Sequence, residues 1–137
     1  MFTSEYKTRV RYADTDQMGY VYYGNYTVFY EMGRVESLRD LGVRYKDLEE
    51  KENVMMPVLD CTMKYLKPAK YDDLVTIRTK IPEMPSIKIK FEYEILSEEG
   101  ELLNSGTTTL VFINKNTHRP VRIPQVIQEV LQPYFEN

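Results

Sequence analysis

Hydrophobic and polar residues alternate along several segments of the chain. The clearest example covers residues 87–95, where the odd positions are Ile, Ile, Phe, Tyr and Ile and the even positions are Lys or Glu. Alternation with a period of two predicts a β-strand with one buried face. Weaker forms of this pattern predict strands over residues 5–11, 58–65, 75–81 and 102–113. The last of these carries apolar or small residues on both faces.

A different periodicity occupies residues 22–41. Apolar residues recur there at helical spacing, and Gly42 supplies a stop. The first half of this segment is apolar nearly all round, whereas charged residues crowd the second half. We therefore expect the first half of the helix to be buried and the far end to face water. Shorter helices are expected at residues 46–51 and 124–131, the second with Pro124 in its first turn.

The order of these elements indicates the fold class. One strand and a long helix are followed by several strands without intervening helices, which favours an antiparallel α+β sheet over repeated βαβ units. A helix of about 18 residues is roughly 27 Å long, and a strand of about ten residues is roughly 33 Å long. One helix can therefore lie lengthwise across the sheet. We expect a single domain over residues 1–137, with a curved antiparallel sheet wrapped around one long central helix.

The composition narrows the class of protein. The chain has 18 basic and 21 acidic residues, and a nucleic-acid partner is not expected because phosphate binding needs an excess of clustered Lys and Arg. No apolar run approaches the ~18 residues of a membrane span, and the first residues lack the layout of a signal peptide. The single cysteine, Cys61, cannot form an internal disulfide, which fits a reducing cytoplasm.

Several common catalytic devices are absent from the sequence. No Gly-x-Ser-x-Gly motif surrounds any serine. We expect Cys61 to pack on the apolar face of its strand and His118 to lie in a turn, so a Cys–His pair is not expected. One His and one Cys also give too few ligands for a zinc site. The remaining candidates for chemistry are carboxylates, hydroxyls and backbone groups.

The most concentrated polar feature is the run of Asp14, Thr15 and Asp16, just before the long helix. Such residues often serve turns, where their carboxylates accept backbone N–H bonds. A Mg²⁺ or Ca²⁺ site is a second interpretation, but two carboxylates supply too few oxygen ligands. A third is catalytic, because a helix start offers unpaired N–H groups that stabilise an oxyanion. Asp16 could then attack a carbonyl or activate a water molecule.

Two segments resemble a known family. Residues 14–26 read DTDQMGYVYYGNY and are followed by Phe29, Glu31 and Arg34. This pattern resembles the 4-hydroxybenzoyl-CoA thioesterase-like acyl-CoA thioesterases, the hotdog-fold branch that includes the thioesterase of the Tol–Pal gene cluster. Residues 65–73, YLKPAKYDD, resemble the family's segment between its second and third strands. The resemblance implies a hotdog fold and hydrolysis of a small, medium or aryl acyl-CoA, without metal or redox cofactor and with coenzyme A as part of the substrate.

The resemblance also implies roles for individual residues. The catalytic carboxylate falls on Asp16, as nucleophile or general base. The oxyanion donor falls on the backbone N–H of Tyr23 at the helix start. The family has either Tyr or His at position 23, which leaves the role of the Tyr23 side chain open.

Three further residues are predicted to bind substrate. Gly19 lets the loop backbone approach the thioester, and Val21 belongs to the same segment. Asn25 either caps the helix or contacts the substrate. Asp14 is assigned to holding the loop in place.

The family resemblance extends to assembly and carrier. It implies a homodimer or homotetramer in which sheets join and active sites lie at the dimer interface. Acyl carrier protein could replace coenzyme A as the carrier. Six of the twelve tyrosines lie in or beside the loop and helix start, and we expect them to wall the thioester pocket or the dimer seam; they are Tyr12, Tyr20, Tyr22, Tyr23, Tyr26 and Tyr30.

Two alternative functions stay open. A hotdog dehydratase acting on 3-hydroxyacyl thioesters usually needs a His base near the helix start, and the only His of this chain is His118. A non-catalytic module that binds acyl-CoA or acyl carrier protein would not require Asp16.

Overall fold

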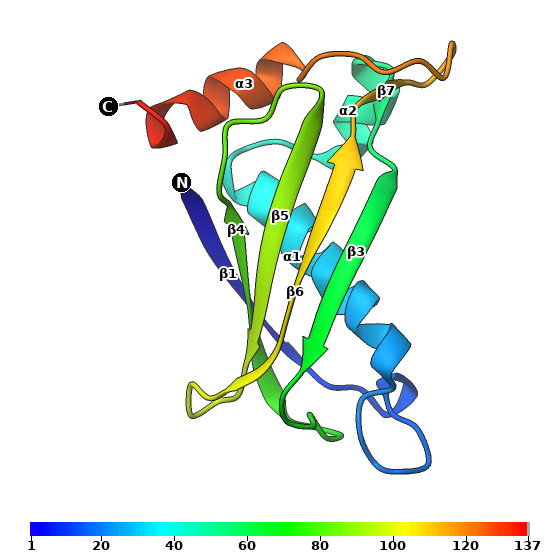
Figure 1. The fold of residues 1–137 in the computed structure, drawn as a ribbon, viewed down its shortest axis with the longest axis vertical. Coiled ribbons are helices and arrows are strands. Elements are labelled where there is room, and N and C mark those ends of the chain that lie inside the picture. Colours follow the sequence, from blue (N-terminus) through cyan, green and yellow to red (C-terminus); the bar gives the residue numbers. More distant parts are fainter. Residues whose placement is uncertain (137) are drawn as a thin grey trace.

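A five-stranded antiparallel sheet forms the body of the protein, whose computed structural model describes residues 1–136 (Figure 1). Its strands lie in the order β1-β4-β5-β6-β3. A second, two-stranded sheet pairs β2 (Val54–Met55) with β7 (Ile113–Asn114). The bounds of the main strands are Phe2–Arg9 for β1, Val58–Tyr65 for β3, Leu74–Ile81 for β4, Lys88–Leu96 for β5 and Leu102–Val111 for β6.

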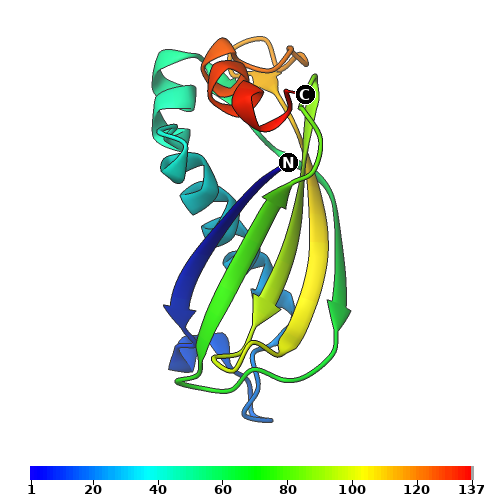
Figure 2. The ribbon, with the colours of Figure 1, turned by 90° about the vertical axis from the view of Figure 1, so that its left-hand side faces the viewer.

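One long helix, α1 (Tyr26–Asp40), packs against β1, β4 and β5. Figure 2 shows the sheet from the side, with α1 along one of its faces. The shorter helices α2 (Tyr45–Lys51) and α3 (Gln125–Leu131) lie toward the upper end of the sheet in the same view. The predicted α+β architecture, an antiparallel sheet with one long central helix, is confirmed.

The core lies between α1 and the sheet. Along β4 and β5 buried residues alternate with more exposed ones, as the sequence predicted. Ile77 and Phe91 have no exposed surface, and neither has Tyr30 on the facing helix. Helix and sheet lie very close together at Gly33, where a Cβ would overlap the side chain of Thr79 and lie 2.7 Å from Ile77 Cγ2. Glycine at this position therefore sets how close the helix lies to the sheet.

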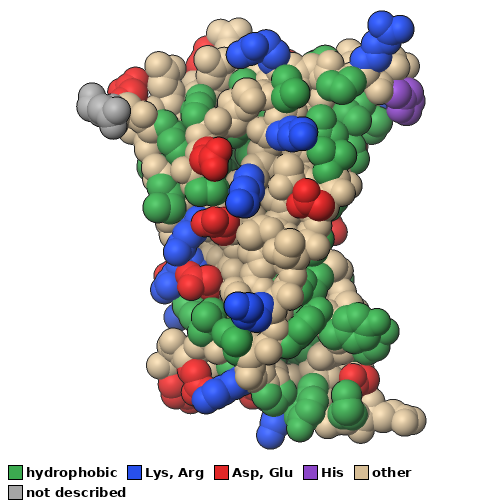
Figure 3. Space-filling model, in the orientation of Figure 1, with side chains coloured by type: hydrophobic (Ala, Val, Ile, Leu, Met, Phe, Trp, Pro, Cys, Tyr) green, Lys and Arg blue, Asp and Glu red, His purple; other side chains and the backbone are tan. Residues whose placement is uncertain are grey.

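The outer face of the sheet is polar. Figure 3 shows Lys, Arg, Asp and Glu side chains spread over this face, with hydrophobic side chains gathered toward its upper and lower ends. Arg78 on β4 pairs with Glu5 on β1 (3.0 Å) and with Glu94 on β5 (3.5 Å). These ion pairs join three neighbouring strands across the solvent side.

The long helix differs from its prediction in two ways. It begins at Tyr26, after a 3-10 turn (Tyr23–Asn25), and not at residue 22. We expected its far end to face water, but Ser37 and Leu38 are buried, so the expectation is wrong for one face. Arg39 and Asp40 are exposed, whereas the Arg34 side chain turns inward, with its Nε buried and with Tyr45 and Tyr93 beside it. Burial of Ser37 is possible because its hydroxyl donates to the Gly33 carbonyl oxygen (2.8 Å).

Strand β3 lies at the edge of the sheet. Seven of its eight residues are exposed, the exception being the partly buried Met63. Cys61 is exposed, so our expectation that it packs on an apolar face is wrong. The alternation in β3 is present, but α1 covers β1, β4 and β5 and leaves the edge strand open.

The remaining differences concern element ends. The first strand starts at Phe2, three residues before its prediction, and the strand predicted over residues 102–113 divides into β6 and β7. None of the helices within residues 1–136 has the length and hydropathy that crossing a membrane requires.

Candidate active site

The loop that carries Asp16 is closed by its own backbone. Thr15 and Val21 form an antiparallel bridge across it. The Asp16 N–H donates to the Tyr20 carbonyl oxygen, and the Gly19 N–H donates to the Asp16 carbonyl oxygen, each at 3.0 Å. Gly19 has φ +83°, in the left-handed region, and a Cβ there would meet no atom within 4 Å. The backbone conformation itself therefore favours glycine at position 19.

Asp14 anchors the start of this loop, as predicted. Its side chain is 5% exposed and accepts hydrogen bonds from the Arg11 N–H (2.8 Å), Nε (3.3 Å) and Nη2 (2.8 Å). Burial acts to raise the pKa of Asp14, but the hydrogen bonds and charge of Arg11 outweigh it and hold the pKa below its usual value. Asp14 is thus an ionised structural group, two residues before Asp16.

The two segments that resemble the thioesterase family lie side by side. The Val21 N–H donates to the Ala69 carbonyl oxygen at 2.8 Å, and Tyr20 forms a bridge with Lys70. The second segment is itself held by a bond from the Lys70 N–H to Asp73 Oδ2 (2.9 Å). These contacts place residues 65–70 against the loop that carries Asp16.

The start of the helix leaves backbone donors available. In the 3-10 turn the first internal bond runs from the Asn25 N–H to the Tyr22 carbonyl oxygen (2.8 Å). The N–H groups of Tyr23 and Gly24 therefore have no acceptor within this turn. The Asn25 side chain does not cap the helix, so that alternative is wrong. Its amide donates instead to the Asp14 carbonyl oxygen (2.9 Å), because Asn25 already has helical backbone angles.

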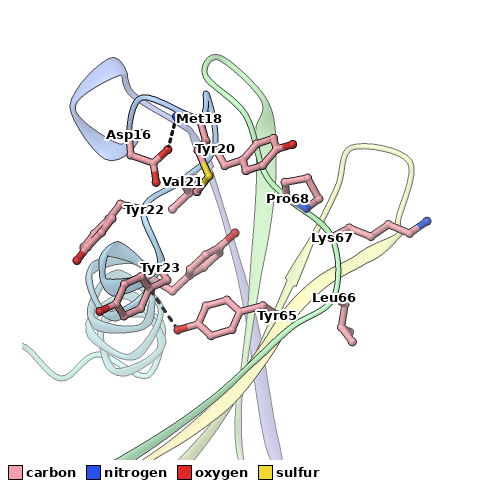
Figure 4. A pocket seen from close by; sticks show the side chains of 11 residues that line it. Asp16, Met18, Tyr20, Val21, Tyr22, Tyr23, Tyr65, Leu66, Lys67 and Pro68 are labelled. Carbon is pink, nitrogen blue, oxygen red and sulfur yellow. Dashed lines mark hydrogen bonds between the residues drawn. The ribbon is translucent and has the colours of Figure 1, made fainter.

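A groove of about 510 Å³ opens beside this loop and helix start (Figure 4). Asp16 stands at its edge, and its carboxylate accepts a hydrogen bond from the Met18 N–H (2.9 Å). The Tyr65 hydroxyl reaches across from the end of β3 to the Tyr23 carbonyl oxygen (3.4 Å). The residues that line the groove are Asp16, Met18, Tyr20, Val21, Tyr22, Tyr23, Tyr26, Tyr65, Leu66, Lys67 and Pro68.

Tyrosine rings form much of the groove wall, at five of its eleven lining residues. The ring centroids of Tyr22 and Tyr23 lie 4.7 Å apart, and Tyr65 meets Tyr26 edge-on at 5.7 Å. Burial raises the pKa of Tyr26 and of Tyr65 above its usual value, so both phenols stay protonated at neutral pH. The wall therefore offers apolar ring surface together with hydroxyl donors.

The predicted tyrosine cluster divides between three places. Four of its six members line the groove, namely Tyr20, Tyr22, Tyr23 and Tyr26. Tyr30 lies in the core and stacks on Tyr93 at 4.3 Å. Tyr12 lies outside the groove, in an edge-on pair with Tyr71 at 5.4 Å.

The predicted site residues are only partly brought together. Asp16, Val21 and Tyr23 line the groove, whereas Gly19 and Asn25 do not. Gly19 lines a second hollow on another side of Asp16, also of about 510 Å³, with Tyr12, Thr15, Gln17 and Tyr71. Asp16 therefore borders two hollows.

The far wall of the groove contains no residue that the sequence assigned to catalysis. Tyr65, Leu66, Lys67 and Pro68 lie there. Their sequence signals were the second family-like segment and, for Lys67, a place among the Lys and Arg residues that are candidates for binding the phosphates of coenzyme A. Lys67 pairs with Glu101 at the rim. Within residues 1–136, no three His, Cys, Asp or Glu side chains gather in a way that could hold a metal ion.

Known proteins resemble this chain over most of its length. The chain is 37% identical to a Bacillus subtilis protein provisionally named acyl-CoA thioesterase YneP, over 89% of this chain and 88% of that protein. It is 34% identical to the acyl-CoA thioester hydrolase YbgC of Escherichia coli, over 87% of this chain and 88% of that protein.

A solved structure and a family profile agree with these relatives. The DHNA-CoA thioesterase from Staphylococcus aureus superposes with a TM-score of 0.88 at 31% identity, covering 100% of this chain and 97% of that one. The predicted hotdog thioesterase family is thus confirmed. Residues 10–131 match the profile of the thioesterase-like superfamily. The chain therefore belongs to the thioesterase-like superfamily.

Proposed function

We propose that this chain hydrolyses the thioester bond of an acyl-coenzyme A at the groove beside Asp16. One observation carries this proposal. The Asp16 carboxylate and Tyr23, the first residue of the 3-10 turn before α1, line the same groove. The carboxylate supplies a nucleophile or base, and the turn supplies backbone N–H donors. The names of the B. subtilis, E. coli and S. aureus relatives support the same reaction class.

Asp16 can act in either of two ways. As a nucleophile, its carboxylate oxygen attacks the thioester carbonyl carbon, the C–S bond breaks, and coenzyme A leaves as a thiolate that takes up a proton. Water then hydrolyses the acyl-aspartyl anhydride to the free acid and restores the carboxylate. As a general base, Asp16 takes a proton from water, which attacks the same carbon directly. Both routes consume one water molecule and release an acid and a thiol.

The Tyr23 N–H is the proposed oxyanion donor. It lies in the first turn before α1, where it has no acceptor within the turn and where the helix dipole favours negative charge. Such donors stabilise the charge that develops on the carbonyl oxygen, and removal of one in other enzymes costs roughly 10²- to 10³-fold in kcat.

The groove supports a compact acyl group. Val21 and the tyrosine rings give it an apolar wall, which suits an aryl, short or medium acyl group. The proposed hydrolysis changes no oxidation state, and Asp16 supplies the nucleophile or base, so the reaction needs neither a metal nor a redox cofactor. Coenzyme A enters as part of the substrate. Acyl carrier protein is an alternative carrier of the same thioester.

The edge strand β3 supports a dimer in which two sheets join. Exposed edge strands offer unpaired backbone groups to another chain, and Leu59 and Tyr65 on β3 are about half exposed, at 53% and 50%. Because Tyr65, the last residue of β3, lines the groove, a second copy paired along β3 would border it. Pairing of two such dimers would give a tetramer. The exposed free thiol of Cys61 fits a reducing cytoplasm.

Thiol release from acyl-CoA esters tests the proposed reaction. We expect the parent protein to release free coenzyme A, and Asp16→Ala and Asp16→Asn to lose at least a hundredfold in kcat, which corresponds to about 2.7 kcal/mol of barrier. Glu98→Gln, at an exposed turn, is the matched control and should retain the parent rate. Equal rates for parent and Asp16 variants would refute the assignment.

Two further assays separate the alternatives. A dehydratase would hydrate crotonyl-CoA without releasing thiol. A binding module would show saturable binding of acyl-CoA and no release of thiol from any ester.

A further inference from the structure

Asn25 stands outside the groove yet is tied to the loop that carries Asp16. Its side-chain amide donates to the Asp14 carbonyl oxygen at 2.9 Å, eleven residues earlier in the chain. The same oxygen accepts a second bond, from the Tyr22 N–H, also at 2.9 Å. One carbonyl group therefore holds both ends of the short segment that contains Tyr23.

The carbonyl group that receives these two bonds is itself fixed. Asp14 is buried, and its carboxylate is clamped by three bonds from Arg11. On the other side of the loop, Val21 is held by Ala69. The bond from Asn25 thus joins the helix start to a rigid point of the loop.

The bond from Asn25 to Asp14 closes the loop of residues 14–25, which contains both proposed catalytic groups. Asp16 lies two residues after Asp14, and Tyr23 lies two residues before Asn25. Together with the bond from the Tyr22 N–H, the contact between Asn25 and Asp14 therefore ties the Tyr23 N–H to the loop that carries the Asp16 carboxylate. Misplacement of a reacting group by about 1 Å costs on the order of 10²-fold in rate.

We infer that Asn25 is a positioning residue, which sets the Tyr23 N–H against Asp16 and does not bind substrate. This inference rests on the proposed function, because it assigns Asn25 to the same reaction. It replaces the two roles predicted from the sequence, helix cap and substrate contact.

Kinetics of Asn25 variants test this inference. We expect Asn25→Ala to lower kcat by about ten- to a hundredfold and to leave KM within about twofold of the parent, since only the transition state loses stabilisation. Asn25→Asp keeps the size of the side chain but removes its N–H donor, and should give the same split. The control is Thr27→Ala, which removes a side-chain bond to the Gly24 carbonyl oxygen (2.7 Å) in the same turn without touching the loop. We expect it to match the parent.

A double variant distinguishes positioning from a general loss of structure. Because Asn25 places the Tyr23 N–H relative to Asp16, its loss should matter less when Asp16 is absent, so Asp16→Ala combined with Asn25→Ala should be slower than Asp16→Ala alone by clearly less than the Asn25 factor measured in the parent. Amide exchange without substrate gives a second readout, and we expect faster exchange at Tyr22, whose N–H donates to the Asp14 carbonyl oxygen, in Asn25→Ala but not in Thr27→Ala.

Four outcomes would overturn the inference: a raised KM with unchanged kcat, unchanged kinetics, unchanged amide exchange, or a double variant slower than Asp16→Ala by the full Asn25 factor. Failure of the proposed function itself gives a different result. In that case Asp16→Ala retains the parent rate, or the parent releases no thiol.

Discussion

Replacement of Gly19 by alanine tests whether the backbone conformation of the loop positions Asp16 for catalysis. Gly19 has φ +83°, and an added Cβ would touch nothing within 4 Å. The substitution therefore creates no clash, and its cost is the left-handed backbone alone, about 1–2 kcal/mol for a residue with a Cβ. For a chain of this length that corresponds to a fall in Tm of roughly 3–8 °C. The protein should stay folded.

Gly100 offers a matched control for this experiment. It has φ +87°, equally open surroundings, and a place in the turn between β5 and β6, away from the groove. Gly100→Ala should therefore cost the same stability as Gly19→Ala and leave thiol release unchanged.

The two variants should differ in activity because their strain acts on different loops. Relaxation at Gly19 breaks the bond from its N–H to the Asp16 carbonyl oxygen (3.0 Å) and displaces the carboxylate. We expect Gly19→Ala to lose at least tenfold in kcat/KM, since small displacements of reacting groups cost up to about 10²-fold. Gly19→Asn should recover part of the loss, because Asn tolerates this backbone region better than Ala does.

Urea denaturation and thiol release, measured on the same samples, check both quantities. Equal activity of Gly19→Ala and Gly100→Ala at equal loss of stability would refute the reasoning, because it would show that the loop conformation at position 19 does not position Asp16.

Two further predictions concern the loop anchor and the edge strand. The folded pKa of Asp14 is lowered, so its contribution to stability is complete above the unfolded pKa of about 3.9 and is lost as pH falls through the folded value. The gap in unfolding free energy between parent and Asp14→Asn should thus stay constant above about pH 5 and shrink below about pH 4; a constant gap down to pH 2 would contradict this. Cys61→Glu places a carboxylate at the middle of exposed β3, and in a symmetric pair along β3 each carboxylate lies near its copy. Light scattering should show a shift toward monomer relative to Cys61→Ser, and an unchanged mass would argue against pairing along β3.

The elements that the sequence predicted best are those in which buried and exposed residues alternate regularly along the chain. In β5 the alternation of Ile89, Phe91 and Tyr93 with charged residues reports burial against α1 directly, so the strand was predicted almost to its ends. The start of α1 was missed because Tyr22 and Tyr26 keep the helical spacing of four residues across the 3-10 turn. The bond from the Asn25 side chain, which ties this turn to the loop, reaches a residue eleven positions away.

The site, too, was predicted from local patterns but not from contacts between distant parts of the chain. Asp16 and Tyr23 were predicted by resemblance to a family motif, and both line the groove. The opposite wall depends on β3 pairing with β6, which sets Tyr65 opposite Asn104, nearly forty residues on. Periodicity carries no information about such a pairing. The exposure of Cys61 was missed for a related reason, since alternation marks an apolar face but not what covers it.

The loop that carries Asp16 is held by main-chain bonds, while the groove wall is made of side chains. Asp16, Gly19 and Val21 are fixed through backbone N–H and carbonyl groups. Tyr20 and Tyr22, from the same loop, both line the groove, and in Figure 4 the Tyr20 ring points toward Pro68 while the Tyr22 ring points away from the opposite wall. A change of ring at either position alters the shape offered to the acyl group without removing any of these backbone bonds. Choice of acyl group and placement of the carboxylate are thus separable in this fold, so new substrate preferences can evolve by substitution of wall residues while hydrolysis is kept.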